Sequence, residues 1–240
     1  MSPEFIPAEV VHDLTARIAA ARETATAIAS SPSHPAESAA YWEQTFEVNA
    51  ASVLAVLGRV HLPPGYIVRY RFYGRHGGDL LVRPFVARSS TDVDTIRQLI
   101  DWHPPPDSVA VSLRSQATRD VDFLYRHFTF ERSPRGIFEY WLAMQELWAS
   151  AAWIHSRIIA DEDAFLGITQ REGWRVDNAP ERFEPVIVAD DEGGAQAAVL
   201  LYSPLGRESI LLQRVQIGSD QAITLLETVP VAQGPRGYTI

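Results

Sequence analysis

The sequence predicts an α+β fold with an N-terminal helical hairpin, a largely antiparallel sheet, one long central helix and a C-terminal β-meander. Apolar residues recur every three to four positions in residues 7–60 and 133–160, which indicates helices. They alternate with polar residues in 66–72, which indicates a strand with one buried face. Clusters of glycine and acidic residues divide 173–240 into short apolar segments, which is typical of a meander.

Residues 1–62 are expected to form two antiparallel helices. The first runs from Pro7 to about Ser30, because proline suits the first helical position. The second begins at Pro35 and reaches about Val60, and the short turn between the two implies an antiparallel pair. The sequence Leu-Pro-Pro-Gly at 62–65 ends this helical region.

Residues 63–132 are expected to form a mixed β/α segment that opens with a β-hairpin. Tyr66, Val68, Tyr70 and Phe72 share one face of its first strand, and Arg69 and Arg71 lie on the other face. A glycine-rich turn at 74–79 leads to a return strand at 80–87. Two short helices at 92–102 and 117–128, with a strand at 108–113 between them, complete the segment.

The last two segments are a long helix at 133–160 and an antiparallel meander within 173–240. Ser133 and Pro134 are a favourable N-cap and first helical residue. The helix is apolar over most of its circumference, which places it at the centre of the fold or at an interface. The meander strands are expected at 183–189, 195–202, 208–217 and 223–231, and the whole chain is expected to form a single domain.

Two residue types are missing from the chain, and their absence excludes several chemistries. There is no cysteine, and all 21 basic residues are arginine. Disulfides, thiolate metal sites and cysteine nucleophiles are therefore excluded, as are Schiff-base lysines and the phosphate-binding lysine of a P-loop. We expect no cofactor and no metal. The N-terminus lacks a basic and apolar leader and no stretch of 18 apolar residues occurs, so we expect a soluble, cytoplasmic protein.

The distribution of charge is uneven. The formal net charge is -9, which disfavours binding to nucleic acid or to an anionic membrane. Residues 48–91, however, contain six arginines against the single acid Asp79. An acidic chain with one basic segment is the main functional observation that the sequence offers.

The arginine-rich hairpin is the first candidate site. Arg69 and Arg71 lie two residues apart on one strand face, about 7 Å from each other. Arg75 and His76 occupy the turn, and Arg83 lies on the return strand. The planar guanidinium fork fits carboxylate or phosphate groups, so these residues predict a site for an anionic small molecule or an acidic protein partner. The competing interpretation is a solvated face whose arginines pair with the chain's own acids.

Two further interpretations remain open. A small enzyme without metal or thiol chemistry would use His76 or His155 as the acid–base group, with Asp79 or Glu146 to orient it. A structural subunit would instead present a helical oligomer interface. Homo-oligomer formation is compatible with every interpretation.

The polar edge of the long helix supplies the residues for such an interface. It contains Glu139 and Glu146, and Trp153 stands out among them because it is aromatic. Arg157, one turn further along the expected helix, would stack on that indole ring. Trp153 and Arg157 are therefore the candidate interface residues.

Overall fold

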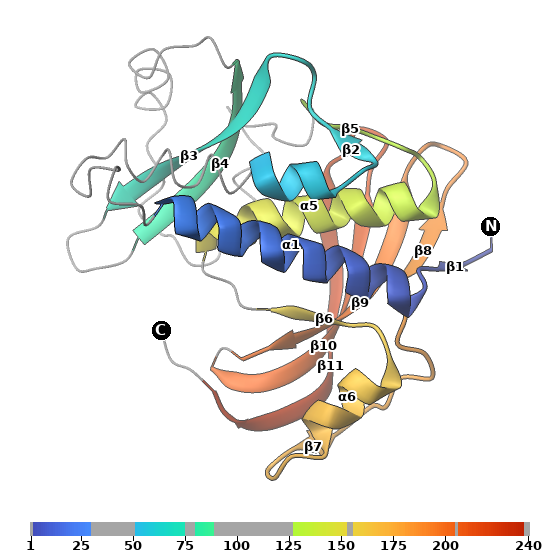
Figure 1. Ribbon diagram of the computed structural model, residues 1–240. Helices are drawn as coiled ribbons and strands as arrows, with labels where there is room; N and C mark the ends of the chain where they lie inside the picture. Colours follow the sequence, from blue (N-terminus) through green and yellow to red (C-terminus); the bar gives the residue numbers. More distant parts are fainter. Residues whose placement is uncertain are drawn as a thin grey trace. The chain divides into compact units, whose positions relative to one another are not determined.

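In the computed structural model, the chain contains helices and a large curled antiparallel sheet (Figure 1). The structure describes residues 2–29, 51–74, 80–88, 127–152, 156–204 and 206–237. The chain divides into two compact units. Unit 1 comprises residues 1–16, 131–142 and 154–240, and unit 2 comprises 17–130 and 143–153. The expectation of a single domain stays a prediction.

Unit 1 is built on a seven-stranded antiparallel sheet. Its order is β1 (Glu4–Phe5), β8 (Val186–Ala189), β9 (Ala195–Ser203), β10 (Arg207–Ile217), β11 (Ile223–Arg236) and β7 (Arg175–Val176). Strand β6 (Arg157–Ile159) pairs with the second half of β9, next to the part that pairs with β8. The four expected meander strands correspond to β8, β9, β10 and β11, within a few residues at each end.

Side chains in the turns hold the meander together. The Asp190 carboxylate accepts hydrogen bonds from the amides of Glu192 at 3.0 Å and Gly194 at 2.6 Å. Gly193 between them has a φ of 83°, a conformation that favours glycine. At the next hairpin, the Asp220 carboxylate accepts from the amide of Ala222 at 3.1 Å. The acidic clusters in the sequence therefore act as turn residues.

Helix α6 (Glu162–Thr169) lies beside strands β9, β10 and β11 (Figure 1), and together they enclose a hydrophobic cluster. Its buried members are Ile159, Phe165, Leu200, Tyr202, Ile210, Val231 and Ala232. The indole of Trp174 packs against this cluster and lies directly over Gly234. Strand β9 contributes the alternate residues Leu200 and Tyr202, whereas β11 contributes the consecutive residues Val231 and Ala232, next to a register shift against β10.

The start of the long helix agrees with the sequence, but its end does not. Helix α5 (Pro134–Ala152) begins where expected, and the Ser133 hydroxyl accepts a hydrogen bond from the Gly136 amide at 3.2 Å. It is shorter than the expected helix, because residues 157–159 pair with β9 as β6 instead of continuing the helix. Residues 153–155 lie outside the described part of the chain.

Glu139 was expected on the polar edge of this helix, and the structure corrects that expectation. Its side chain is only 1% exposed. The carboxylate accepts a hydrogen bond from Arg135 Nε at 2.9 Å, one helical turn earlier. A buried carboxylate is tolerated where it is paired and hydrogen-bonded, so the guanidinium of Arg135 makes this position compatible with the core.

The N-terminal helix also forms as expected. Helix α1 (Ala8–Ala29) begins directly after Pro7, whose carbonyl accepts from the amides of Val10 and Val11. Most of the expected second helix lies outside the described residues. Residues 51–56 are helical, but Val60 belongs to β2 (Val60–His61), which pairs with β5 (Thr129–Phe130) in unit 2. The helix therefore ends before Val60.

The hairpin expected after this helix is present in unit 2. Strand β3 (Tyr66–Gly74) pairs antiparallel with β4 (Leu80–Arg88) over its full length. The two helices and the strand expected between 92 and 128 lie almost entirely outside the described residues. None of the helices that the structure describes is both long enough and apolar enough to cross a membrane.

Strand β11 is long, and its first half is open to solvent. Residues 224–228 are all exposed, and Leu225 and Leu226 are 42% and 51% exposed. On its outer side, β11 pairs only with β7, through Ala232 and Gln233. Register shifts against β10 interrupt the strand at three places. In unit 1, residues 223–229 therefore form an edge of the described sheet.

The contact between Trp174 and Gly234 predicts the effect of a single methyl group. A Cβ at position 234 would meet the indole ring, with Nε1 at 2.8 Å, so Gly234→Ala forces the ring to move. We expect a loss of about 1–3 kcal/mol in the free energy of unfolding, measured by urea denaturation. Gly167→Ala in α6 is the control, because a Cβ there meets nothing within 4 Å. Equal stability of the two variants would contradict this packing.

Candidate functional site

The register of β3 and β4 brings three arginine positions to one face of the hairpin. Arg69 pairs with Phe85, and Arg71 lies directly opposite Arg83. Directly opposed residues of an antiparallel pair share a face, with Cβ atoms about 4.5–5.5 Å apart. Arg83 therefore belongs to the same face as Arg69 and Arg71. We call the face defined by these three residues the hairpin arginine face.

The opposite face of the hairpin is buried at Val68. Val68 is 3% exposed, and it pairs with Val86, which is half-buried. Arg88 pairs with Tyr66 on this same side. The Tyr66 ring stacks on His127 with ring centroids 5.8 Å apart. The turn residues Arg75, His76 and Asp79 lie outside the described residues.

The composition of unit 2 limits the number of acids available to these arginines. Unit 2 contains 12 arginines and 12 acidic residues, and unit 1 contains nine arginines and 18 acidic residues. The net charge of -9 thus belongs to unit 1. Within residues 66–88, five arginines accompany the single acid Asp79. Unit 2 is therefore neutral as a whole, and its local excess of positive charge lies in the hairpin segment.

The candidates on the long helix are only partly within the described chain. Glu146 is a half-buried residue of α5, and Trp153 and His155 lie outside the described residues. The sequence predicted that Arg157 follows Trp153 on the long helix, but Arg157 lies in a strand. It opens β6, directly opposite Tyr202 of β9, and its guanidinium carbon lies 5.1 Å from the centroid of the Tyr202 ring.

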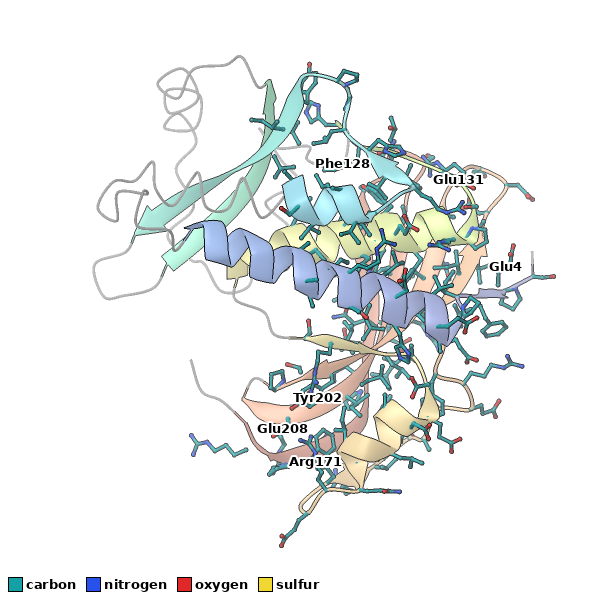
Figure 2. All side chains as sticks on the ribbon, in the orientation of Figure 1. Glu4, Phe128, Glu131, Arg171, Tyr202 and Glu208 are labelled. Atoms are coloured by element: carbon teal, nitrogen blue, oxygen red, sulfur yellow. The ribbon has the colours of Figure 1, made fainter. Side chains whose placement is uncertain are left out.

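Arg157 is one member of a cluster that the sequence did not reveal. Figure 2 shows Arg171, Tyr202 and Glu208 close together beside α6. The Tyr202 hydroxyl donates to Glu208 Oε2 at 2.9 Å, and Arg171 Nη2 donates to the same oxygen at 3.0 Å. The guanidinium of Arg171 also lies over the rings of Trp174 and Tyr202, at 5.4 and 6.0 Å. Its members come from β6, the end of α6, β9 and β10, so no local sequence pattern marks the cluster.

The one carboxylate of this cluster is satisfied within it. Glu208 accepts from both a hydroxyl and a guanidinium, and both hydrogen bonds are strong because the acceptor is ionised. Cation–π contacts stabilise the arginines over the rings. The Glu208 side chain is 19% exposed, and the residue Tyr202 is 6% exposed. We interpret the cluster as a set of polar side chains that covers the edge of the hydrophobic core of unit 1.

A histidine and a carboxylate also meet in unit 1, but they are not the predicted pair. His12 Nε2 lies 2.8 Å from Asp161 Oδ2. Asp161 is the N-cap of α6, and its Oδ1 accepts from the Ala164 amide at 2.6 Å. Both carboxylate oxygens therefore hold elements together, since one bonds α1 and the other caps α6. The His12 side chain is 56% exposed, and we interpret this pair as a structural link.

No three histidine or acidic side chains gather into a metal site within the described ranges. Comparisons of the chain with protein-family models, with curated proteins and with solved structures found no match. Support for each candidate site therefore comes from its geometry and its charge.

The hydroxyl of Tyr202 offers a measurable test of the cluster. Tyr202→Phe removes a hydrogen bond to a carboxylate, and we expect it to lower the free energy of unfolding by about 1–2 kcal/mol. A double-mutant cycle with Glu208→Gln, followed by urea denaturation, isolates the coupling between the two side chains. A coupling energy near zero would show that the hydroxyl and the carboxylate do not act together.

Proposed function

We propose that this protein is a non-catalytic binding protein that recognises an anionic ligand through the hairpin arginine face. The observation that carries the proposal is the β3–β4 register, which places Arg71 directly opposite Arg83 with Arg69 two residues away. Like charges placed directly opposite each other in a sheet destabilise it. A bound anion would remove that cost.

The chemistry of arginine defines the class of ligand. Each guanidinium presents five donors in a planar fork that matches the oxygens of carboxylate and phosphate. Strand geometry sets the three positions about 5 Å apart across the strands and about 7 Å apart along one strand. Such a face fits a ligand with more than one anionic group, either a small molecule or an acidic segment of a partner protein.

Two other features support an anion in preference to an internal partner. Residues 66–88 contain five arginines and the single acid Asp79, so the hairpin arginines exceed the acids close to them in sequence. The buried Val68 assigns the apolar side of the hairpin to packing. The pairing of two helices in residues 1–62 and the central position of the long helix stay predictions that accompany this proposal.

Two alternatives stand beside this proposal. The acid–base interpretation needs His76 or His155 with Asp79 or Glu146; His76, His155 and Asp79 lie outside the described residues, so it stays a prediction. In the assembly interpretation, Arg157 was expected beside Trp153 on one helix, whereas it lies in β6 over Tyr202. We prefer anion recognition because the β3–β4 register brings its arginine positions together.

The proposal predicts which arginine signals respond to an anion. Pyrophosphate added to the ¹⁵N-labelled protein at constant ionic strength should shift the Nε–Hε NMR signals of Arg69, Arg71 and Arg83. Each signal is assigned by its loss in the matching arginine-to-glutamine variant. Arg88 is the matched control, because it lies in the same hairpin on the other face. An acidic peptide of alternating glutamate and serine is the second probe.

Stability separates a binding role from a structural one. Arg71→Gln should weaken pyrophosphate binding about tenfold or more, because it removes hydrogen bonds between charged groups. The melting temperature without ligand should stay constant or rise, since a like-charge pair is relieved. A marked fall in that melting temperature, or equal shifts at Arg88, would show that the arginines serve the fold.

A further inference from the structure

At one end of the sheet in unit 1, a row of polar side chains lies on the face opposite to Tyr202, Ile210 and Ala232. Ser203 of β9 lies opposite Ser209 of β10, Ser209 lies opposite Gln233 of β11, and Gln233 lies opposite Arg175 of β7. Because directly opposed residues share a face, the four positions form one row across four strands. The next row along these strands contains Tyr202, Ile210 and Ala232, which point to the other face and into the core.

Two more arginines extend this row. Arg207 of β10 lies directly opposite Arg236 of β11, and both residues are exposed. Arg207 Nη1 donates a long hydrogen bond to Gln233 Oε1 at 3.5 Å, which places its guanidinium beside the polar row. We call this set the outer patch. It consists of Arg175, Ser203, Arg207, Ser209, Gln233 and Arg236.

The positive charge of the outer patch is only partly compensated. Arg175 forms an ion pair with Asp177, with Nε 2.7 Å from Oδ1. Arg207 and Arg236 form no ion pair with any residue that the structure describes. Glu208 follows Arg207 directly in the sequence, but its side chain points to the opposite face, where Tyr202 and Arg171 donate hydrogen bonds to it.

This arrangement is unusual for unit 1, which contains twice as many acidic residues as arginines. Unit 1 has 18 acidic side chains, yet Arg207 and Arg236 lie directly opposite each other and form no ion pair with a described residue. This part of an acidic unit is therefore locally positive. Opposed like charges cost stability in a sheet, and an external anion relieves that cost. Strands β7, β9, β10 and β11 hold the backbone of all six positions, so binding has to order the side chains but not the chain that carries them.

We infer that the outer patch binds a multiply charged oxyanion, such as the phosphoryl group of a small molecule. Arg207 and Arg236 would donate from two strands, as a fork on each side of the anion. The Gln233 amide nitrogen and the Ser209 hydroxyl add neutral donors in the neighbouring row. The inference goes beyond the function proposed above, because it assigns a separate site in the other unit.

Titration of the labelled full-length protein with pyrophosphate tests the outer patch separately from the hairpin. The Nε–Hε signals of Arg207 and Arg236 should shift in the wild type and also in the Arg71→Gln variant. If the hairpin does not bind but the outer patch does, only the signals from unit 1 move. If the signals of Arg207 and Arg236 stay fixed while the hairpin signals move, the outer patch is not a site and the inference fails.

Variants of the outer patch give the affinity. The double variant Arg207→Gln/Arg236→Gln should bind pyrophosphate at this site about tenfold more weakly or worse, measured by isothermal titration calorimetry in the Arg71→Gln background. Arg214→Gln is the matched control, since Arg214 lies in the same strand but forms an ion pair with Glu227 at 3.1 Å. It should bind like the parent protein.

A second substitution covers the case in which the double variant is unstable. Ser209→Asp places a carboxylate next to Arg207 along β10, in the row beside the two opposed arginines, and supplies internally the charge that the anion provides. It should abolish binding and raise the melting temperature of the protein without ligand. Pyrophosphate binding of unchanged affinity in Ser209→Asp, or equal losses in the double variant and in Arg214→Gln, would overturn the inference.

Discussion

The alternation of side chains along the strands is the constraint on which the rest of this structure depends. In unit 1, the face with Tyr202, Ile210 and Ala232 is buried at one end of the curled sheet, and the other face, with Ala197, Val199 and Val215, is buried at the other end. A shift of one residue in the register would exchange the two faces of a strand. Burial of one face therefore also fixes what the other face presents. The same argument applies to the hairpin, where buried Val68 defines the side opposite Arg69 and Arg71.

The core of unit 1 is closed by charged groups as well as apolar ones. Glu208 accepts from Tyr202 and Arg171, and the guanidinium groups of Arg157 and Arg171 cover the aromatic rings. Arginine suits this role because its planar, weakly hydrated head stacks on rings while it still donates hydrogen bonds. In a chain without lysine, arginine is the only side chain with a permanent positive charge. Arginine has two roles in this structure. Some arginines stack on rings inside clusters, and others stand on open sheet faces.

Local patterns in the sequence predicted much of the fold. Turn residues such as Asp190 and Gly193 delimited the meander strands, and Ser133 marked the start of α5. The end of α5 was not predictable from periodicity, because the apolar pattern continues past Ala152 while pairing with β9 turns residues 157–159 into a strand. Tertiary pairing decided that boundary.

The candidate sites were likewise predictable from the sequence only in part. Alternation alone placed Arg69 and Arg71 on one face, but only the register adds Arg83 to them. The outer patch needed the register of four strands, since Arg175 and Arg236 are far apart in the sequence. Glu139 was misplaced because a charged residue on a helix normally indicates solvent, and the partner that permits its burial is four residues earlier.

The open half of β11 has a consequence for the behaviour of the protein at high concentration. A strand with one open edge and two exposed leucines invites the edge of a neighbouring molecule to add to the sheet. The register shift within residues 225–227, and Pro230 directly after the edge, which lacks an amide hydrogen, limit the length of the ladder that this edge offers. The irregularity of β11 thus makes it a poorer template for fibril-like association.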